Sequence, residues 1–247
     1  MTAVDLKLGV ACPTRHILGH DARQELGGEA NVSYAPPLAA TLTGASVRQL
    51  AYWRRTTPTH GVLFAPEHGT RPRVLYSYQD IVALRMFVQL RGHLSLQKVR
   101  KVASYLLKHY PDTHLASHSI KAVPGGRTAV WVSPDGEYVD VIERPGQGGL
   151  KFVMDDIFRS FTTGTGQRVP DLAEPTQGVT IDPGVRGGFP VIEGTRIPFT
   201  VVAGLYADGM TSGEIAELYP AVTEADVVGA AQLAELVAEN AHVKAAA

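Results

Sequence analysis

The side chains best suited to chemistry lie in one short basic stretch, residues 42–55. Arg48 and Gln49 stand near its start, and side chains of this length can reach the base edges in the major groove of DNA. The small residues before them would let a helix N-terminus approach phosphate. Aromatic and basic residues that suit backbone phosphates follow. The candidate DNA-binding residues here are Ser46, Arg48, Gln49, Tyr52, Arg54 and Arg55.

Charge supports this reading because it is divided unevenly along the chain. The net charge is −1, yet residues 31–110 carry eleven Lys or Arg against two Asp or Glu. Residues 178–247 carry three basic against nine acidic side chains. A basic segment is the usual electrostatic footprint of nucleic-acid binding, whereas an acidic segment repels phosphate and is free to bind protein.

The apolar spacing predicts helices that would position the basic stretch. A short helix over 37–42, a turn at Thr43-Gly44 and a second helix over 45–55 form a helix–turn–helix pair. Short extended pieces at 62–64 and 74–76 are interpreted as a two-stranded wing, with Arg71 and Arg73 as further DNA contacts. A helix capped by Ser77 and another from 95 to Pro111 follow. Trp53, rather than Tyr52, is expected in the core.

The order of these elements resembles the MerR family of winged helix-turn-helix regulators. Residues 46–53 (SVRQLAYW) are similar to its recognition helix, and residues 76–81 (YSYQDI) to the junction after its wing. The resemblance covers 37–107 and implies a DNA-binding transcriptional regulator. Pro111 ends the helix that in this family continues into a dimer coiled coil, and no cysteine pair follows.

The remaining sequence predicts four further segments around this domain. Residues 1–36 are expected to form an N-terminal arm, and 37–111 the DNA-binding domain. Residues 112–163 contain a β-hairpin, with strands over 128–132 and 137–142 joined by the turn 133–136. Residues 164–177 are rich in Thr, Gly and Pro and are expected to be a linker. The fold class is mainly α with small β elements (α+β).

Residues 178–247 are expected to form a three-helix domain with a short β-hairpin. Helices are predicted over 199–207, 212–219 and 223–239. Residues 188–199 (GFPVIEGTRIPF) resemble a small domain of unknown function in antitoxins of VapB-like systems, whose toxin is a PIN-type ribonuclease. The resemblance assigns toxin binding or assembly to Glu193, Gly194, Thr195 and Arg196. Arg196 is alternatively an internal brace between the hairpin and the helices.

Enzyme chemistry, metal binding and cofactors are not expected. The single Cys12 excludes an internal disulfide, and the histidines do not have the spacing of a metal site. His114 and His118 are four residues apart but lie in a loop-like sequence after Pro111. No run of about 18 apolar residues predicts a membrane span, and no signal peptide is seen at the N-terminus, so the chain is expected to be cytoplasmic.

The sequence therefore favours an antitoxin of a VapBC-like type II system. We expect a homodimer that binds operator DNA, represses its own operon and neutralises a cognate PIN-type toxin. One alternative is a stand-alone MerR-like transcription factor that senses a small effector. Another is an oligomerisation scaffold, which would show no salt-dependent DNA binding.

Overall fold

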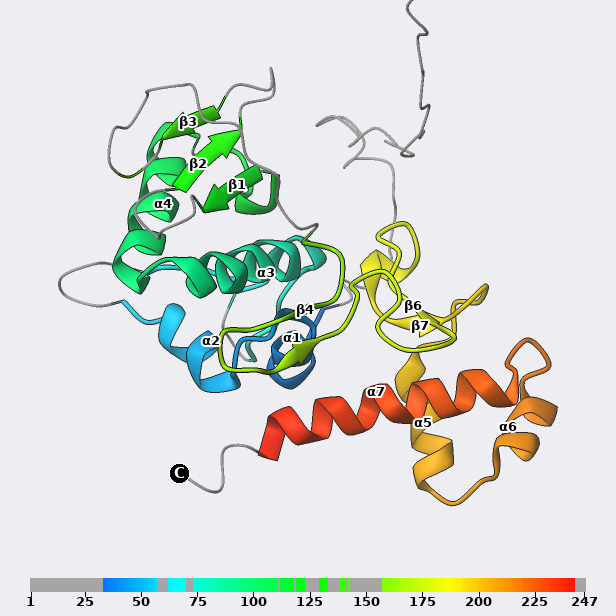
Figure 1. Ribbon diagram of the computed structural model, residues 1–247. Helices are drawn as coiled ribbons and strands as arrows, with labels where there is room; N and C mark the ends of the chain where they lie inside the picture. The colour runs from blue at the N-terminus through cyan, green and yellow to red at the C-terminus, as the bar shows by residue number, and fades with distance from the viewer. Residues whose placement is uncertain are drawn as a thin grey trace, which may run out of the picture. The chain divides into compact units, whose positions relative to one another are not determined.

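The computed structural model describes residues 33–56, 62–69, 73–110, 112–117, 119–122, 129–132, 138–140, 142 and 157–242, drawn in colour in Figure 1. Nearly all of the predicted N-terminal arm and the wing residue Arg71 lie outside these ranges. The described residues fall within one unit, 31–247. They are mainly helical with small antiparallel sheets, which confirms the predicted fold class at that level.

Two short helices joined by a tight turn occupy the basic stretch. Helix α1 (Pro36–Thr43) ends at Gly44, whose φ of 75° is the left-handed conformation that favours glycine. Helix α2 (Val47–Trp53) begins at Ser46, which forms a capping box with Gln49. The predicted pair of helices is therefore present, with α2 two residues shorter at each end.

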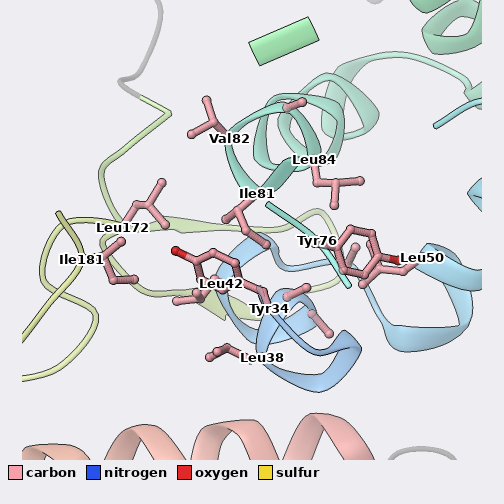
Figure 2. Close-up of a cluster of buried hydrophobic side chains, with 14 of the residues drawn as sticks. Tyr34, Leu38, Leu42, Leu50, Tyr76, Ile81, Val82, Leu84, Leu172 and Ile181 are labelled. Atoms are coloured by element: carbon pink, nitrogen blue, oxygen red, sulfur yellow. The ribbon is translucent and has the colours of Figure 1, made fainter. Parts of the chain in front are cut away.

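Two longer helices follow. Helix α3 (Tyr78–His93) is capped by Ser77 as predicted, and α4 (Leu96–His109) is capped by Ser95. Phe87 of α3 packs edge-to-face on Phe64, with ring centroids 6.0 Å apart. The core formed by α1 to α4 is continuous with that of the C-terminal half. Figure 2 shows Leu172 and Ile181 in the same cluster as Leu42 and Ile81.

The predicted wing is wrong in its pairing. The backbone N–H groups of Leu63 and Phe64 both donate to the carbonyl of Trp53, at 3.1 Å each. Tyr76 forms an antiparallel bridge with Tyr34, a residue from the N-terminal side. Leu63, Phe64 and Tyr76 are all buried. Burial of these apolar side chains therefore decides their positions, and the described parts of 62–64 and 74–76 do not pair with each other.

The predicted β-hairpin is confirmed and extended by a third strand. Strands β2 (Ala129–Val132) and β3 (Tyr138–Asp140) pair antiparallel with Trp131 opposite Val139. Strand β1 (Ser119–Ala122) pairs with the other edge of β2, with Ile120 opposite Trp131. A 3₁₀ turn over Leu115–Ser117 precedes it. Strand β1 was not predicted because its four residues carry a weak apolar pattern.

The segment expected to be a linker is packed against the rest of the chain. Strands β4 (Phe161–Thr162) and β5 (Arg168–Val169) form a small hairpin, and Leu172 is buried. The Thr176 hydroxyl donates to the carbonyl of Gly229 at 2.9 Å. The Gly, Thr and Pro residues that suggested a linker instead lie in tight turns between buried residues.

The C-terminal elements agree with prediction. Strands β6 (Val179–Thr180) and β7 (Val191–Ile192) pair antiparallel, and a 3₁₀ turn spans Arg186–Gly188. Helices α5 (Phe199–Ala207), α6 (Ser212–Leu218) and α7 (Glu224–His242) follow. Helix α7 packs against α5 and α6. None of the described helices is long and apolar enough to cross a membrane.

The C-terminal half docks directly on the helices of the basic stretch. Helix α7 packs on α1, where the Thr41 hydroxyl donates to the carbonyl of Leu236 at 3.2 Å. The hydroxyl of the buried Tyr34 donates to the carbonyl of Gly188. Burial raises the pKa of Tyr34 above its ordinary range, so its hydroxyl stays protonated as a donor. The two regions thus share one packed core.

Substitution of two glycines in the C-terminal helices tests this packing. A Cβ at Gly229 of α7 would lie 1.8 Å from the carbonyl oxygen of Gln177, whereas one at Gly204 of α5 would meet nothing within 4 Å. Gly→Ala in a helix interior ordinarily stabilises by about 0.5–1 kcal/mol. We expect that gain for Gly204→Ala, but a loss of about 1–3 kcal/mol for Gly229→Ala from overpacking. Chemical denaturation measures both, and equal gains would contradict the close approach.

Candidate nucleic-acid interface

Helix α2 presents its polar side chains outward and anchors its apolar ones. Leu50 and Trp53 are 1% and 4% exposed, whereas Tyr52 is 45% exposed. Trp53 therefore lies in the core, as predicted. Arg48 and Gln49 are exposed. The helix thus offers a polar and aromatic surface held in place by two buried residues.

An open groove of about 760 Å³ runs beside this surface. One wall is α2 with its preceding turn, including Arg48, Gln49 and Tyr52. The floor and opposite wall come from the end of α3, at Val88 to Gly92, and from the β4–β5 turn, at 163–167. Residues more than a hundred positions apart in the sequence therefore line one groove.

The chemistry of the groove favours an anion. Arg48 and Arg91 are its charged lining residues, and its described lining contains no Asp or Glu. Hydroxyl and amide side chains supply further hydrogen-bond donors. Such a surface suits phosphate groups, which bind proteins through arginine, hydroxyl and amide donors.

Two predicted contact residues serve the helix itself. The Ser46 hydroxyl accepts from the backbone N–H of Gln49 at 3.1 Å, and the Gln49 side-chain oxygen accepts from the N–H of Ser46 at 2.8 Å. This capping box occupies the Ser46 side chain and one end of the Gln49 amide. Gln49 keeps only its NH₂ group for another partner, so Arg48 is the stronger candidate for base contact.

The other predicted arginines have different surroundings. Arg54 is only part-exposed, and its Nη1 donates to the Tyr76 hydroxyl at 2.6 Å. Burial raises the pKa of Tyr76, and the nearby Arg54 opposes that rise. Arg54 therefore braces α2 against Tyr76 rather than facing outward. Arg55 and Arg73 are exposed, and Arg71 lies outside the described residues.

Sequence reasoning missed Arg100, which supports Tyr52. Arg100 is 8% exposed on α4, and its guanidinium carbon lies 5.7 Å from the centre of the Tyr52 ring. Its two terminal nitrogens are buried and have no hydrogen-bond partner among the described residues. The cation therefore packs against an aromatic face that lines the groove. Only the tertiary structure brings the two together.

Sequence reasoning also missed Arg85, which fixes the far wall of the groove. Arg85 is fully buried on α3. Its guanidinium donates to the carbonyls of Ile157 at 2.6 Å, Arg159 at 2.7 Å and Pro170 at 3.1 Å, and also to that of Leu42 at the end of α1. These bonds tie the segment that carries β4 and β5 to α1 and α3.

A buried acid–histidine pair could be mistaken for a catalytic dyad. His114 Nε2 lies 3.3 Å from Oδ1 of the fully buried Asp80, and its Nδ1 accepts from the N–H of Ala116 at 3.0 Å. Asp80 Oδ2 accepts from the N–H groups of Ser77 and Glu67. Both ring nitrogens are engaged, so this histidine has no free lone pair for a metal or a proton transfer. His118 lies outside the described residues.

The predicted C-terminal site forms a turn that does not line the groove. Gly194 has a φ of 69°, and the Thr195 hydroxyl donates to the carbonyl of Ile192 at 2.9 Å. Thr195 thus bonds local backbone. Glu193 and Arg196 are exposed. No group of three or more His, Cys, Asp or Glu side chains in the described ranges could hold a metal ion.

One family model matches the C-terminal part of the chain. Residues 179–234 match the family described as "Protein of unknown function (DUF433)". An uncharacterized protein, y4eO, from Sinorhizobium fredii is 37% identical over 62 residues. That match covers 25% of this chain and 28% of the relative, so the chain spans less than a third of the relative's length.

One solved structure is also similar, the X-ray crystal structure of Rv2018 from Mycobacterium tuberculosis. It is 19% identical, covers 82% of this chain and 99% of its own, and has a TM-score of 0.43. At that level of likeness the comparison carries no argument about this chain.

The contribution of the Arg85 hydrogen bonds to stability can be tested by substitution. Arg85→Met should lower the free energy of unfolding by at least about 3 kcal/mol, because several buried carbonyls lose their donor at about 1–3 kcal/mol each. The matched control is Arg91→Met on the same helix. Arg91 is exposed and should change stability by no more than about 0.5 kcal/mol. Urea denaturation measures both, and equal small effects would contradict the role given to Arg85.

Proposed function

We propose that this chain is a DNA-binding regulator in which α2 contacts the major groove. The observation that carries the proposal is the outward surface of α2, with Arg48 and Tyr52 beside a groove that has arginines and no carboxylate in its described lining. The core anchors Leu50 and Trp53 fix the direction of this surface. The basic surplus of residues 31–110 adds the long-range attraction that nucleic-acid binding needs.

In this proposal each exposed residue has a distinct task. Arg48 reads base edges, since arginine pairs with guanine through two hydrogen bonds. Tyr52 and Arg55 hold backbone phosphates and set the register of the helix. Ser46, Gln49 and Arg54 stabilise the helix through its cap and through Tyr76. Specificity therefore rests on fewer side chains than the sequence alone suggested.

We further propose that the chain is an antitoxin that neutralises a PIN-type ribonuclease. The support is the resemblance of residues 188–199 to antitoxins of VapB-like systems, together with the acidic surplus of 178–247. A nuclease that binds RNA has a basic substrate surface, which an acidic partner can cover. Exposed apolar side chains on the C-terminal helices, Val201, Tyr206, Leu218 and Val228, offer contact area for a protein.

The effector-sensing alternative also has an observation in its favour. The groove volume of about 760 Å³ falls in the range of small-molecule sites. The two functions differ in what the chain binds besides DNA. An effector sensor would bind a small anion at the groove and need no partner protein, whereas an antitoxin requires an adjacent gene for a nuclease.

Arg48→Ala tests the DNA-binding role. We expect about a tenfold loss of affinity for operator DNA, with random DNA little changed, because one base-reading arginine contributes about 1–3 kcal/mol of discrimination. Fluorescence anisotropy at several salt concentrations measures this. Arg196→Ala removes an exposed arginine from a turn outside the groove and should leave both affinities unchanged. Equal weakening on both DNAs would make Arg48 a phosphate contact instead.

Co-purification tests the antitoxin role. This chain is co-expressed with the product of the neighbouring reading frame, which the proposal requires to be a nuclease, and the mixture is analysed by size exclusion and by RNA cleavage. We expect one stable complex with nuclease activity suppressed. A nuclease that remains fully active and elutes alone would remove the antitoxin proposal, while the DNA-binding proposal would stand.

A further inference from the structure

The β4–β5 hairpin lines the same groove as α2. Its turn is tightly closed. The N–H of Thr163 donates to the carbonyl of Gln167, and the N–H of Gly166 to the carbonyl of Thr163, both at 2.9 Å. The hydroxyls of Thr163 and Thr165 lie 2.9 Å apart. Gly164, Thr165 and Gly166 form an exposed tip.

Packing holds this turn in a fixed position against the α1–α2 turn. A Cβ on Gly44 would lie 2.4 Å from Cγ2 of Val169 and 2.9 Å from Cγ2 of Thr163, so the hairpin rests directly on that glycine. On its other side, the Gln167 side-chain amide donates to Asn240 of α7 at 3.2 Å. The hairpin therefore packs on the turn that leads into α2 and is bonded to α7.

The tip has the composition of a phosphate contact. Small residues let a nucleic-acid backbone approach closely, and a Cβ at Gly164 or Gly166 would meet only open space. Threonine hydroxyls donate to phosphate oxygens. Arg168 on β5 is exposed beside the tip and adds positive charge. Within the segment expected to be the wing, Leu63, Phe64 and Tyr76 are instead buried, with backbone bonds to Trp53 and Tyr34.

We propose that the β4–β5 turn, Thr163–Gln167, is the wing of this protein and contacts the DNA phosphate backbone flanking the site of α2. The inference rests on the proposed DNA-binding function and assigns it a second contact, from a segment about 115 residues beyond α2 in the sequence. The ligand is a phosphodiester backbone rather than base edges, since the tip carries no long side chain that could read a base.

Charge substitutions at the tip test the inference. Thr165→Glu places a negative charge next to phosphate, and we expect affinity for operator DNA to fall about tenfold. Thr165→Lys should raise affinity and steepen the dependence of log K on log salt by about one, the change expected for one added phosphate contact. Both variants lose the same hydroxyl contact with Thr163. Opposite effects on affinity therefore report charge rather than folding.

The matched controls are Thr200→Glu and Thr200→Lys, at an exposed threonine of α5 that does not line the groove. They should leave affinity and salt slope close to those of the unmodified chain. One outcome would overturn the wing assignment and leave the DNA-binding proposal standing. In that outcome the unmodified chain binds DNA and Arg48→Ala lowers the affinity, but the Thr165 variants behave like their Thr200 controls. If the unmodified chain binds no DNA, the proposed function itself fails.

Discussion

The structure depends on a buried guanidinium at Arg85. Removing such a group from water costs several kcal/mol, and charge-assisted bonds to backbone carbonyls offset that cost. Here the carbonyls belong to the end of α1 and to residues 157–170, and the guanidinium also lies 5.1 Å from the centre of the Phe161 ring. One side chain thereby fixes the hairpin β4–β5, α1 and α3 in a single arrangement. The β4–β5 turn that these bonds help to position also lines the groove beside α2.

The acidic C-terminal half and the basic half are also joined by direct hydrogen bonds. Asn240 of α7 donates to the Thr41 hydroxyl of α1 at 3.0 Å and accepts from Gln167 of the β4–β5 turn at 3.2 Å. The end of α7 is therefore bonded both to α1 and to the β4–β5 turn that lines the groove. These contacts link the two halves of the described chain within one packed unit.

The local features of this fold were predictable from the sequence. Helix starts at Ser46, Ser77 and Ser95, the β2–β3 hairpin and all three C-terminal helices depend on caps, turns and apolar spacing within a few residues. The burial of Trp53 and exposure of Tyr52 follow from the same spacing. Much of the candidate site on α2 could thus be predicted, including its exposed candidate for base contact, Arg48.

What the sequence by itself determined is the set of elements and the division of charge between the two halves, because both are local properties of the chain. Only the tertiary structure decided how they meet. It buried Arg85 and Asp80, paired Tyr76 with Tyr34, packed 164–177 where a linker was expected and set the β4–β5 turn beside α2. These contacts join residues far apart in the sequence. These contacts are stable because the groups on both sides are removed from water together and form hydrogen bonds with each other. Such pairing does not appear as a periodic pattern of apolar residues in the sequence.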